Sequence, residues 1–293
     1  PKDTTDPSAT YEYEYPSEVN LRSYKPAFEG DRTQVDRVVQ ALLSAKRPVF
    51  YVGGGVIQAD AETPLRELVK ATRGPVASTL MGLGAYPGSD KQSLGMLGMH
   101  GTYEANMAMH EADLILALGA RFDDRVTNNP DKFSPKATIV HLDVDPASVD
   151  KIISSDIALV GDAQWVLNTL WEAYQHQESQ RDEAARKKQQ QELDQWWAQL
   201  EEWRSAHGLN HNLVPQKDQS ILPQLAVQTL YRVTEGEAFI TSDVGQHQMF
   251  AAQYYHFDEP RRWINSGGLG TMGFGLPSAM GVQMGNPEAV VAC

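Results

Sequence analysis

Short apolar runs alternate with longer amphipathic stretches through the first half of the chain. The runs are PVFYV (48–52), PVAST (75–79), DLILAL (113–118), TIVHL (138–142) and IALV (157–160). Apolar runs of this length, without polar alternation, are typical of strands that are buried on both faces. Helical patterns lie between most of them, so we predict an α/β fold, with a Rossmann-like parallel sheet covered by helices.

The segment DRTQVDRVVQALLSAKR (31–47) predicts the first amphipathic helix. Its apolar side chains fall on one helical face and comprise Val35, Val38, Val39, Leu42 and Leu43. Asp31, followed three residues later by Gln34, resembles a capping box in which Asp replaces Ser or Thr. We therefore expect a capped helix start here.

A polar stretch interrupts this rhythm, and a second α/β pattern follows it. Residues 165 to about 218 are rich in Gln, Glu, Arg and Lys, which favours a solvated helical connector. The pattern then resumes as helix (222–233), strand (238–243), helix (246–255) and strand (289–293). A second α/β domain therefore begins in this part of the chain.

These changes in composition predict four regions. They are a linker (1–26), a central domain (27–172), a polar helical connector (173–218) and the first part of a second α/β domain (219–293). The chain starts at Pro1 rather than Met, and its last strand pattern stops at Cys293. We interpret it as an internal piece of a longer protein.

Composition narrows the class of protein. The formal net charge of −13 argues against nucleic acid or an anionic membrane as a partner. The single cysteine excludes a disulfide framework and a cysteine-based metal site, and it agrees with a reducing, cytoplasmic compartment. No apolar run approaches the ~20 residues of a membrane span. The sequence therefore has the composition of an ordinary globular protein.

Unusual residues follow every one of the first five strand patterns. They are GGG (53–55), TLMGLG (79–84), GARFDDR (119–125), DVD (143–145) and GDA (161–163), and LGMHG (97–101) precedes a helix pattern. Ligands of open parallel sheets bind outside the carboxyl ends of the strands, so these segments share one rim. The triple glycine alone is more often a tight turn, and it does not fit G-x-G-x-x-G. Together the segments favour a dinucleotide site.

Charged side chains on this rim suit such a ligand. Arg121 and Arg125 can neutralise phosphate or carboxylate groups with two parallel hydrogen bonds. Asp143, at a strand end, can accept from ribose hydroxyls, and Asp162 is a second candidate.

Three sets of residues on or near the rim keep an alternative interpretation. Asp123 and Asp124 could simply pair with the adjacent arginines, and Met99 and His100 could be loop-packing residues rather than a platform for a flat ring. His141, inside an apolar strand, is interpreted as a satisfied core histidine.

The histidines His207 and His211 have i,i+4 spacing but no glutamate follows the first, so we predict no zinc site there. His247 lies in SDVGQHQ, just after a strand pattern, where the amides of a helix start could also hold an anion. Further along, SGGLGTMGFG contains five glycines within residues 267–275. So dense a cluster indicates a tight turn or a large group lying directly against the backbone.

The combined motifs resemble a known family, the catalytic large subunit of acetohydroxyacid synthase, also called acetolactate synthase. The motifs are YVGGG, STLMGLG, LGMLGMHGTYEAN, GARFDDRVTN, SDVGQHQMF and WINSGGLGTMGFGLP, and the chain resembles the enterobacterial biosynthetic form. The family's subunit has pyrimidine-binding, FAD-binding and pyrophosphate-binding α/β domains. The resemblance implies the whole second domain and the beginning of the third here, with the Mg2+ ligands beyond Cys293 and no activity in this piece alone.

The resemblance also implies cofactor contacts. For an extended FAD without a redox role in turnover they are Gly53, Gly54, Thr79, Leu80, Met81, Leu97, Gly98, Met99, His100, Gly119, Ala120, Arg121, Phe122, Asp123, Asp143, Val144, Gly161, Asp162, Gly267 and Gly268. For the diphosphate of thiamine diphosphate (ThDP) they are Val244, Gly245, Gln246 and His247.

Four residues receive catalytic roles through the resemblance. The Gly270 carbonyl would accept from the 4′-amino group of ThDP, and Met272 would hold the cofactor in its bent conformation. Arg125 would bind the carboxylate of the second ketoacid, and Met99 would line the same substrate pocket. Gly273 and Gly275 are interpreted as serving the start and packing of the next helix.

The implied reaction decarboxylates pyruvate and joins its two-carbon unit to a second pyruvate or to 2-ketobutyrate, in branched-chain amino acid biosynthesis. The implied partners are an identical large subunit and a small regulatory subunit. Alternatives are a sister ThDP enzyme such as glyoxylate carboligase or a decarboxylase, a redox flavoprotein or NAD-dependent enzyme, and a non-catalytic dinucleotide-binding module. RFDDR argues against the first, and SDVGQHQ and SGGLGTMGFGLP argue against the last.

Overall fold

A six-stranded parallel sheet forms the centre of the molecule. The computed structural model describes residues 7–8, 10, 12, 14–18, 20–21, 24–210, 213–215 and 220–293. The strand order is β3-β2-β1-β4-β5-β6. The strands are β1 (Pro48–Val52), β2 (Val76–Ser78), β3 (Ser93–Met96), β4 (Leu114–Leu118), β5 (Thr138–Asp143) and β6 (Ile157–Val160). This confirms the predicted α/β parallel sheet, and much of the predicted linker and His211 lie outside the described residues.

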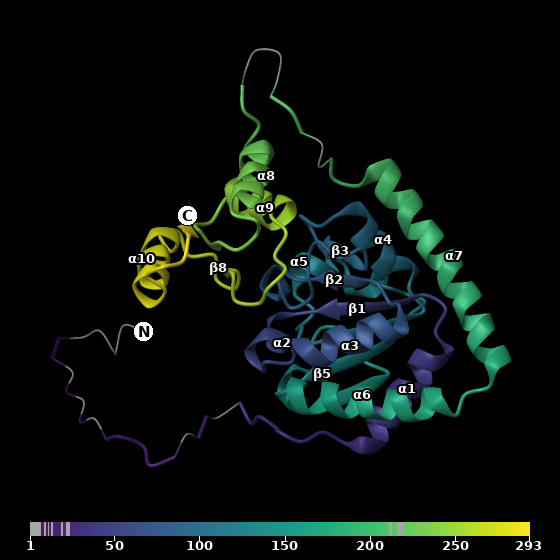
Figure 1. Ribbon diagram of the computed structural model, residues 1–293. Coiled ribbons are helices and arrows are strands. Elements are labelled where there is room, and N and C mark those ends of the chain that lie inside the picture. The colour runs from purple at the N-terminus through teal and green to yellow at the C-terminus, as the bar shows by residue number, and fades with distance from the viewer. Residues whose placement is uncertain are drawn as a thin grey trace.

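Helices cover both faces of the central sheet (Figure 1), and alternate strand residues pack against the two helical layers. Phe50 and Val52 of β1 pack with α1 (Arg32–Ser44), α2 (Gly54–Gln58), α3 (Glu62–Thr72) and α6 (Ala163–Ser179). Val49 and Tyr51 face α4 (Tyr103–Glu111) and α7 (Glu183–His207). Burial on both faces explains the unbroken apolar runs in the sequence.

The start of α1 forms only half of the predicted capping box. Asp31 is the N-cap, and its side chain accepts from the Thr33 N–H at 2.8 Å. Gln34 instead accepts from Arg37 at 2.7 Å, so the reciprocal bond of the box is not formed. The prediction was wrong for Gln34 because the arginine one turn later offers its side chain a charged donor.

Several elements differ from the sequence prediction. The edge strand β3 was not predicted, because SLGM has no β-branched residue and its pairing with β2 is irregular. The polar connector is not simply solvated, since α7 buries Leu193, Trp196 and Leu200 against the sheet. In addition, α6 continues through the boundary predicted at residue 172.

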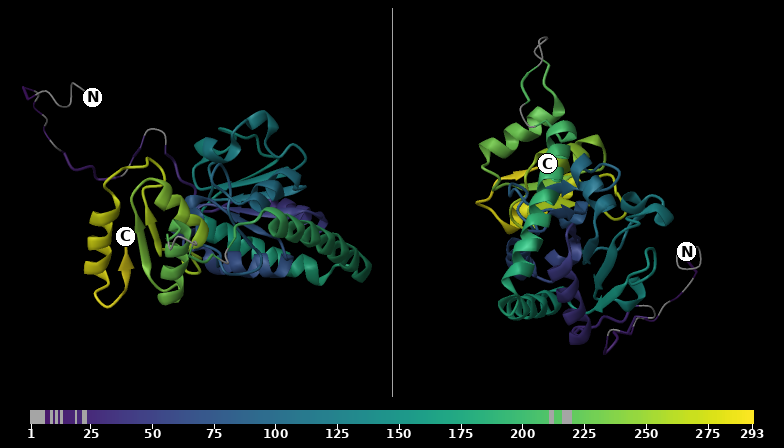
Figure 2. Two further views of the ribbon diagram at one scale, coloured as in Figure 1. Left: turned by 90° about the horizontal axis from the view of Figure 1, so that it is seen from above. Right: turned by 90° about the vertical axis from the view of Figure 1, so that its right-hand side faces the viewer.

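A smaller parallel sheet follows, in the order β8-β7-β9. Its strands are β7 (Phe239–Ser242), β8 (Trp263–Asn265) and β9 (Val291–Ala292), with the helices α8 (Pro223–Val233), α9 (Gln246–Tyr254) and α10 (Gly275–Gly285). Seen from above, this sheet and its helices form a lobe beside the central domain (Figure 2). The lobe begins the second α/β unit that the sequence predicted.

A packed seam joins this lobe to the central domain. Leu83 and Met96 of the central domain share one hydrophobic cluster with Ile240, Phe257 and other residues of the lobe. Arg66 donates to the Asp258 carbonyl at 2.9 Å across the seam. The two units therefore hold a defined relative position.

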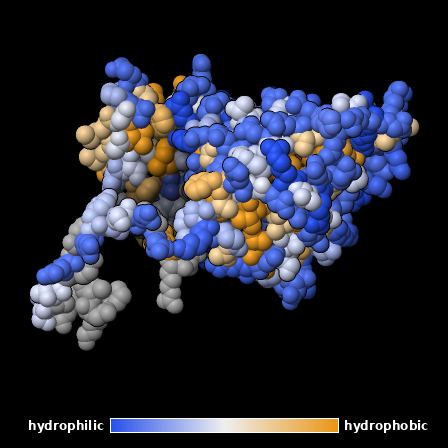
Figure 3. Space-filling model, turned by 90° about the horizontal axis from the view of Figure 1, so that it is seen from below, coloured by the Kyte–Doolittle hydropathy of each residue, from blue (hydrophilic) through white to orange (hydrophobic). Residues whose placement is uncertain are grey.

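Large apolar side chains are exposed on the lobe, and Figure 3 shows orange side chains gathered there. In the glycine loop and α10 they are Leu269 (91%), Met272 (80%), Leu276 (65%), Met280 (61%) and Met284 (82%). An exposed apolar patch of this kind marks an interaction surface.

Candidate functional site

The carboxyl ends of the six central strands carry most of the predicted flavin contacts. Gly53 and Gly54 follow β1, Thr79 to Met81 follow β2, Leu97 to His100 follow β3, Gly119 to Asp123 follow β4, Asp143 and Val144 end β5, and Gly161 and Asp162 follow β6. The parallel strands place all these segments along one edge of the sheet. The structure thus brings the predicted rim together.

Glycines on this rim allow neighbouring loops to lie in direct backbone contact. A Cβ at Gly53 would lie 2.2 Å from the Gly119 carbonyl oxygen, and one at Gly82 would lie 2.3 Å from the Val52 carbonyl oxygen. The short helix α2 and the 3-10 turn η1 (Leu80–Gly82) can therefore begin side by side. Gly53 is required by this packing of the chain on itself.

The loops after β3 and β4 hold each other in place. The Met99 N–H donates to the Arg125 carbonyl at 2.8 Å. Asn106 of α4 binds both the N–H and the carbonyl of Gly98, at 2.8 and 3.0 Å. Met99 nevertheless exposes 62% of its surface, so its side chain is free to contact a ligand.

The charged residues of the second loop divide into a paired and an unpaired arginine. Arg121 forms an ion pair with Asp123, as the alternative interpretation of the sequence held. The guanidinium of Arg125 makes no hydrogen bond or ion pair in the part of the chain that the structure describes. Burial alone would raise the pKa of Asp123, but the Arg125 N–H and the two arginines hold it below its ordinary value.

Phe122 cannot offer its ring to a ligand on the rim. Its side chain is fully buried and packs edge-to-face against Tyr51, Phe133 and His141. Its backbone has a φ of +54°, in the left-handed region that residues other than glycine rarely adopt. Only the backbone of this predicted flavin contact can therefore take part.

His141 is a core histidine, as the sequence predicted, but it is only half satisfied, because its buried Nδ1 has no hydrogen-bond partner in the described structure. It is 1% exposed, and its Nε2 lies 3.0 Å from the Ala120 carbonyl oxygen. Burial lowers the pKa of His141, despite the nearby Asp143. The neutral ring therefore supports the Ala120 loop from below.

The ends of β5 and β6 are partly covered by the chain itself. The Ala27 N–H donates to the Val144 carbonyl at 2.9 Å, and a Cβ at Gly161 would lie 3.0 Å from the Gly30 nitrogen. Asp162 caps α6 by accepting from Gln164 N–H at 2.9 Å. The sequence did not predict this crossing segment, because nothing local in residues 27–30 indicates it.

Asp143 keeps an oxygen for a ligand. Its Oδ1 accepts from the Asp145 N–H at 2.9 Å, and its Oδ2 makes no hydrogen bond to any described residue. Its half-buried position at the strand end agrees with the predicted contact to ribose hydroxyls.

The predicted ThDP residues lie in the second lobe, at the start of α9 and in the glycine loop before α10. Val244 to His247 lie at the start of α9, whose N-cap Gly245 provides no side-chain hydrogen bond. The free N–H groups of this first turn favour an anion. A Cβ at Gly270 would lie 3.8 Å from Val244 Cγ1, so the two predicted ThDP segments are neighbours.

Gly267 connects this lobe to the flavin rim. A Cβ there would lie 2.4 Å from Met81 Sδ and 2.8 Å from Asn265 Oδ1. The buried Nδ2 of Asn265 has no hydrogen-bond partner in the described structure. By contrast, a Cβ at Gly268 or Gly273 would meet no atom within 4 Å, and Met272 is 80% exposed. The loop therefore leaves open space on the side of Gly268 and Met272.

Asp243 is a residue of this site that the sequence did not predict. Its carboxylate accepts from the Val244 N–H at 2.8 Å and from the Gly273 N–H through both oxygens, at 2.8 and 2.9 Å. Gly275 begins α10 and packs on the Asp243 nitrogen, which confirms the interpretation of that glycine. The sequence signal that could have indicated this role is the position of Asp243 in SDVG, directly after a strand and just before a glycine-capped helix start.

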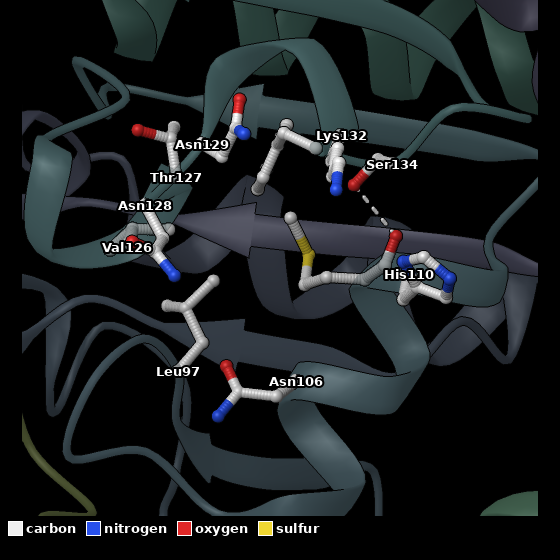
Figure 4. Close-up of a pocket in the computed structure, with 11 residues that line it drawn as sticks. Leu97, Asn106, His110, Val126, Thr127, Asn128, Asn129, Lys132 and Ser134 are labelled. Carbon is white, nitrogen blue, oxygen red and sulfur yellow. Dashed lines mark hydrogen bonds between the residues drawn. The ribbon is translucent and has the colours of Figure 1, made fainter.

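A cavity of about 320 Å³ lies behind the loops after β3 and β4. Figure 4 shows Leu97 and Asn106 on one side of it and Asn129, Lys132 and Ser134 on the other. The connection from β4 to β5 lines one side of it and contains α5 (Asp124–Thr127) and the 3-10 turn η2 (Pro130–Lys132). Of the predicted site residues only Leu97 lines it, so the cavity is separate from the rim.

Metal ligands are not gathered anywhere in the described residues, where no three His, Cys, Asp or Glu side chains form a group. The His207 ring packs at a tilt against the Tyr103 ring, with ring centroids 4.4 Å apart. Among the helices that the structure describes, none is both long and apolar enough to cross a bilayer.

Comparison with known proteins identifies two matching families. Residues 35–170 match the thiamine pyrophosphate enzyme central domain, and residues 243–293 match the C-terminal TPP-binding domain of thiamine pyrophosphate enzymes. The first match covers the six-stranded sheet, and the second begins at Asp243.

Curated relatives cover the whole chain. It is 51% identical over 293 residues to the acetolactate synthase isozyme 3 large subunit of Escherichia coli (strain K12), covering 100% of this chain and 49% of that protein. It is 48% identical to the acetolactate synthase large subunit of Haemophilus influenzae, again over 100% of this chain and 49% of the relative. The acetolactate synthase of Mycobacterium avium is 40% identical over 99% of this chain and 45% of its own length. The chain thus spans about half the length of the relatives it matches.

Proposed function

Because the chain belongs to the acetolactate synthase large-subunit family of thiamine pyrophosphate enzymes, we propose that it supplies the central domain and part of the C-terminal domain of an acetolactate synthase. The observation that carries this proposal is the 51% identity along all 293 residues with a protein of that name. The reaction decarboxylates pyruvate and joins the two-carbon unit to a second 2-ketoacid, giving 2-acetolactate or 2-aceto-2-hydroxybutyrate for branched-chain amino acid biosynthesis.

The rim fits an extended FAD. Its loops present backbone N–H groups at the carboxyl ends of six strands, and Asp143 Oδ2 and the Arg125 guanidinium have no partner in the described chain. Gly267 brings the second lobe against Met81, where the flavin end of the site would lie. The contacts proposed for FAD are those predicted from the sequence, with Phe122 contributing only its backbone.

The start of α9 and the glycine loop fit ThDP. The first-turn amides at Gly245 to His247 would hold the diphosphate, and the Gly270 carbonyl would accept from the aminopyrimidine. Met272, exposed above this loop, would hold the ring in its bent conformation. When bound, ThDP supplies the electron sink that stabilises the carbanion left by loss of CO2.

Arg125 and Met99 would select and orient the acceptor. A guanidinium without an intramolecular partner can bind a carboxylate with two hydrogen bonds, and Met99 lies on the loop bonded to the Arg125 carbonyl. Fixing the acceptor this way makes the second bond formation effectively intramolecular.

The proposed partners are a second large subunit and a small regulatory subunit, which the term "large subunit" in the relatives' names supports. Mg2+ would join the diphosphate. Among the alternatives, a sister ThDP enzyme has the most support, because the two family models describe thiamine pyrophosphate enzymes in general and would fit it equally.

The test uses the longest natural polypeptide that contains this sequence, supplied with pyruvate, Mg2+ and FAD, with and without ThDP. Acetolactate, measured after acid conversion to acetoin, is expected only with ThDP. Acetaldehyde as the product, or consumption of glyoxylate, would move the assignment to a sister enzyme.

An Arg125→Met variant separates the acceptor role from the others. The KM for the second ketoacid should rise about 10- to 100-fold, which corresponds to the loss of charge-assisted hydrogen bonds. Arg73→Met, which removes a surface arginine paired with Asp194, is the matched control and should leave this KM unchanged. Equal KM values in the two variants would remove Arg125 from the acceptor site.

A further inference from the structure

Asp243 lies at the carboxyl end of β7, between the two segments that carry the proposed ThDP contacts. Its Oδ1 accepts from the N–H groups of Val244 and Gly273, both at 2.8 Å, and its Oδ2 accepts from the same Gly273 N–H at 2.9 Å. The bonds to Gly273 span 30 residues of sequence. One carboxylate therefore ties the loop before α10 to the loop before α9.

The backbone at Gly273 is shaped for this contact. Its φ of +83° lies in the left-handed region, whereas a Cβ there would meet no atom within 4 Å. The glycine is thus explained by backbone conformation and not by crowding. Two residues later, a Cβ at Gly275 would lie 2.6 Å from the Asp243 nitrogen. The start of α10 is therefore seated on Asp243 through both backbone and carboxylate.

Met272 stands between two anchors. On its N-terminal side, the Ser266 carbonyl accepts from the Gly270 N–H at 2.9 Å, and Ser266 Oγ accepts from the Thr271 N–H at 3.0 Å. On its C-terminal side, Asp243 holds Gly273. The Met272 side chain is 80% exposed, so the backbone is held while the side chain projects outward.

We propose that Asp243 is a positioning residue for the cofactor. It fixes the peptide that follows Met272, and it sets the distance between this loop and the amides of α9 that take the diphosphate. The proposal rests on the proposed ThDP site. An ionised carboxylate suits this role because it only accepts hydrogen bonds, and charged acceptors form the shorter and stronger ones. An asparagine would keep one acceptor oxygen and turn an NH2 group toward a backbone donor.

The first test needs no cofactor. Amide hydrogen exchange is measured by mass spectrometry on the longest natural polypeptide that contains this sequence, without ThDP, in peptides that span 266–275. Asp243→Asn should speed exchange in these peptides about tenfold or more, because the loop loses its C-terminal anchor. Asp182→Asn is the control, since it makes the same substitution at the N-cap of α7, outside these peptides, where the carboxylate accepts from the Ala185 N–H, and it should leave their exchange unchanged. Exchange as slow in Asp243→Asn as in the wild type would overturn the proposal.

The second test adds ThDP to the same proteins. Asp243→Asn should lower kcat about 100-fold, as expected for a misplaced catalytic group, with a much smaller change in the KM for pyruvate. The near-ultraviolet circular-dichroism band of the bound aminopyrimidine should weaken in parallel. Asp243→Glu keeps a carboxylate and should restore part of kcat. An unchanged kcat and band in Asp243→Asn would show that the residue only stabilises the loop, and would also overturn the proposal.

The two tests separate the two proposals. A wild-type protein that binds no ThDP, together with slow exchange that depends on Asp243, would overturn the proposed function and leave the anchor as a structural one. ThDP binding with exchange that is independent of Asp243 would support the proposed function and overturn the positioning role.

Discussion

The two parallel sheets of this chain lie in opposite environments. Every residue of β1 and β4 is buried between two helical layers, whereas both residues of β9 are only partly buried. The helix α10, which covers the small sheet, buries Gly275 alone. Both regions follow the same α/β pattern, so the pattern determines which elements form but not how well they are covered.

The difference has a chemical consequence at the site. The rim loops of the central sheet are held by direct backbone contact, as between Gly53 and Gly119, in addition to the Asn106 side chain that binds Gly98. The glycine loop of the small lobe is held by side chains, Asp243 and Ser266, and leaves Met272 exposed. The central domain thus provides a rigid half of the proposed site, and the lobe provides a half that depends on a few hydrogen bonds.

The largest expected effect is a difference in stability between alanine substitutions at two leucines, one in each region. Leu116→Ala removes a side chain that is 0% exposed in β4 and should lower the free energy of unfolding by about 2–5 kcal/mol. Leu276→Ala, at 65% exposure on α10, should change it by less than about 0.5 kcal/mol. Urea denaturation followed by tryptophan fluorescence measures both. Similar costs in the two variants would mean that α10 is covered in solution, and the comparison would fail.

Substitutions at a pair of glycines should change the free energy of unfolding in opposite directions. Gly53→Ala would place a Cβ 2.2 Å from the Gly119 oxygen, and the overpacking should cost about 1–3 kcal/mol. Gly281→Ala, within α10, would meet no atom within 4 Å and should stabilise the chain by about 0.5–1 kcal/mol. Thermal unfolding of the two variants should therefore shift in opposite directions. A destabilised Gly281→Ala would show that something packs closely on that face of α10.

The sequence predicted the central sheet well because its signals are local. Each long run, such as Leu114–Leu118, is apolar enough to require burial on both faces, and each is followed by residues that change the backbone direction. The three-residue strand β8 and the edge strand β3 escaped because short strands carry little pattern. For α7, the spacing of Leu193, Trp196 and Leu200 did contain a helical stripe, but the polar composition around it hid the signal.

From the sequence, only those residues of the candidate site that directly follow a strand could be predicted. The residues after each strand could be placed on one rim because parallel strands must share that edge. Contacts between distant segments could not, because no local pattern specifies them. The bond from Asp243 to Gly273 and the crossing of Ala27 over Val144 are of this kind.

The smallest expected effect is on the pH dependence of the free energy of unfolding, to which each region contributes one histidine. His141 of the central sheet is buried and His256 of the lobe is half-buried, and in each case burial is the main cause that lowers the pKa of the ring. Below the unfolded pKa of about 6.5, the unfolded chain binds protons that the folded rings do not, so stability should fall as the pH falls from there.

Replacing one histidine at a time shows how much of this loss of stability at low pH comes from each region. His141→Gln can still donate to the Ala120 carbonyl, and it should remove the part of the slope that belongs to the central sheet. His256→Gln should remove the part that belongs to the lobe. Urea midpoints between about pH 7 and pH 5 measure the slope, since that range crosses the unfolded pKa. If His141→Gln left the slope intact while His256→Gln abolished it, the pH sensitivity would belong to the lobe and its seam, and the central sheet would contribute rigidity alone.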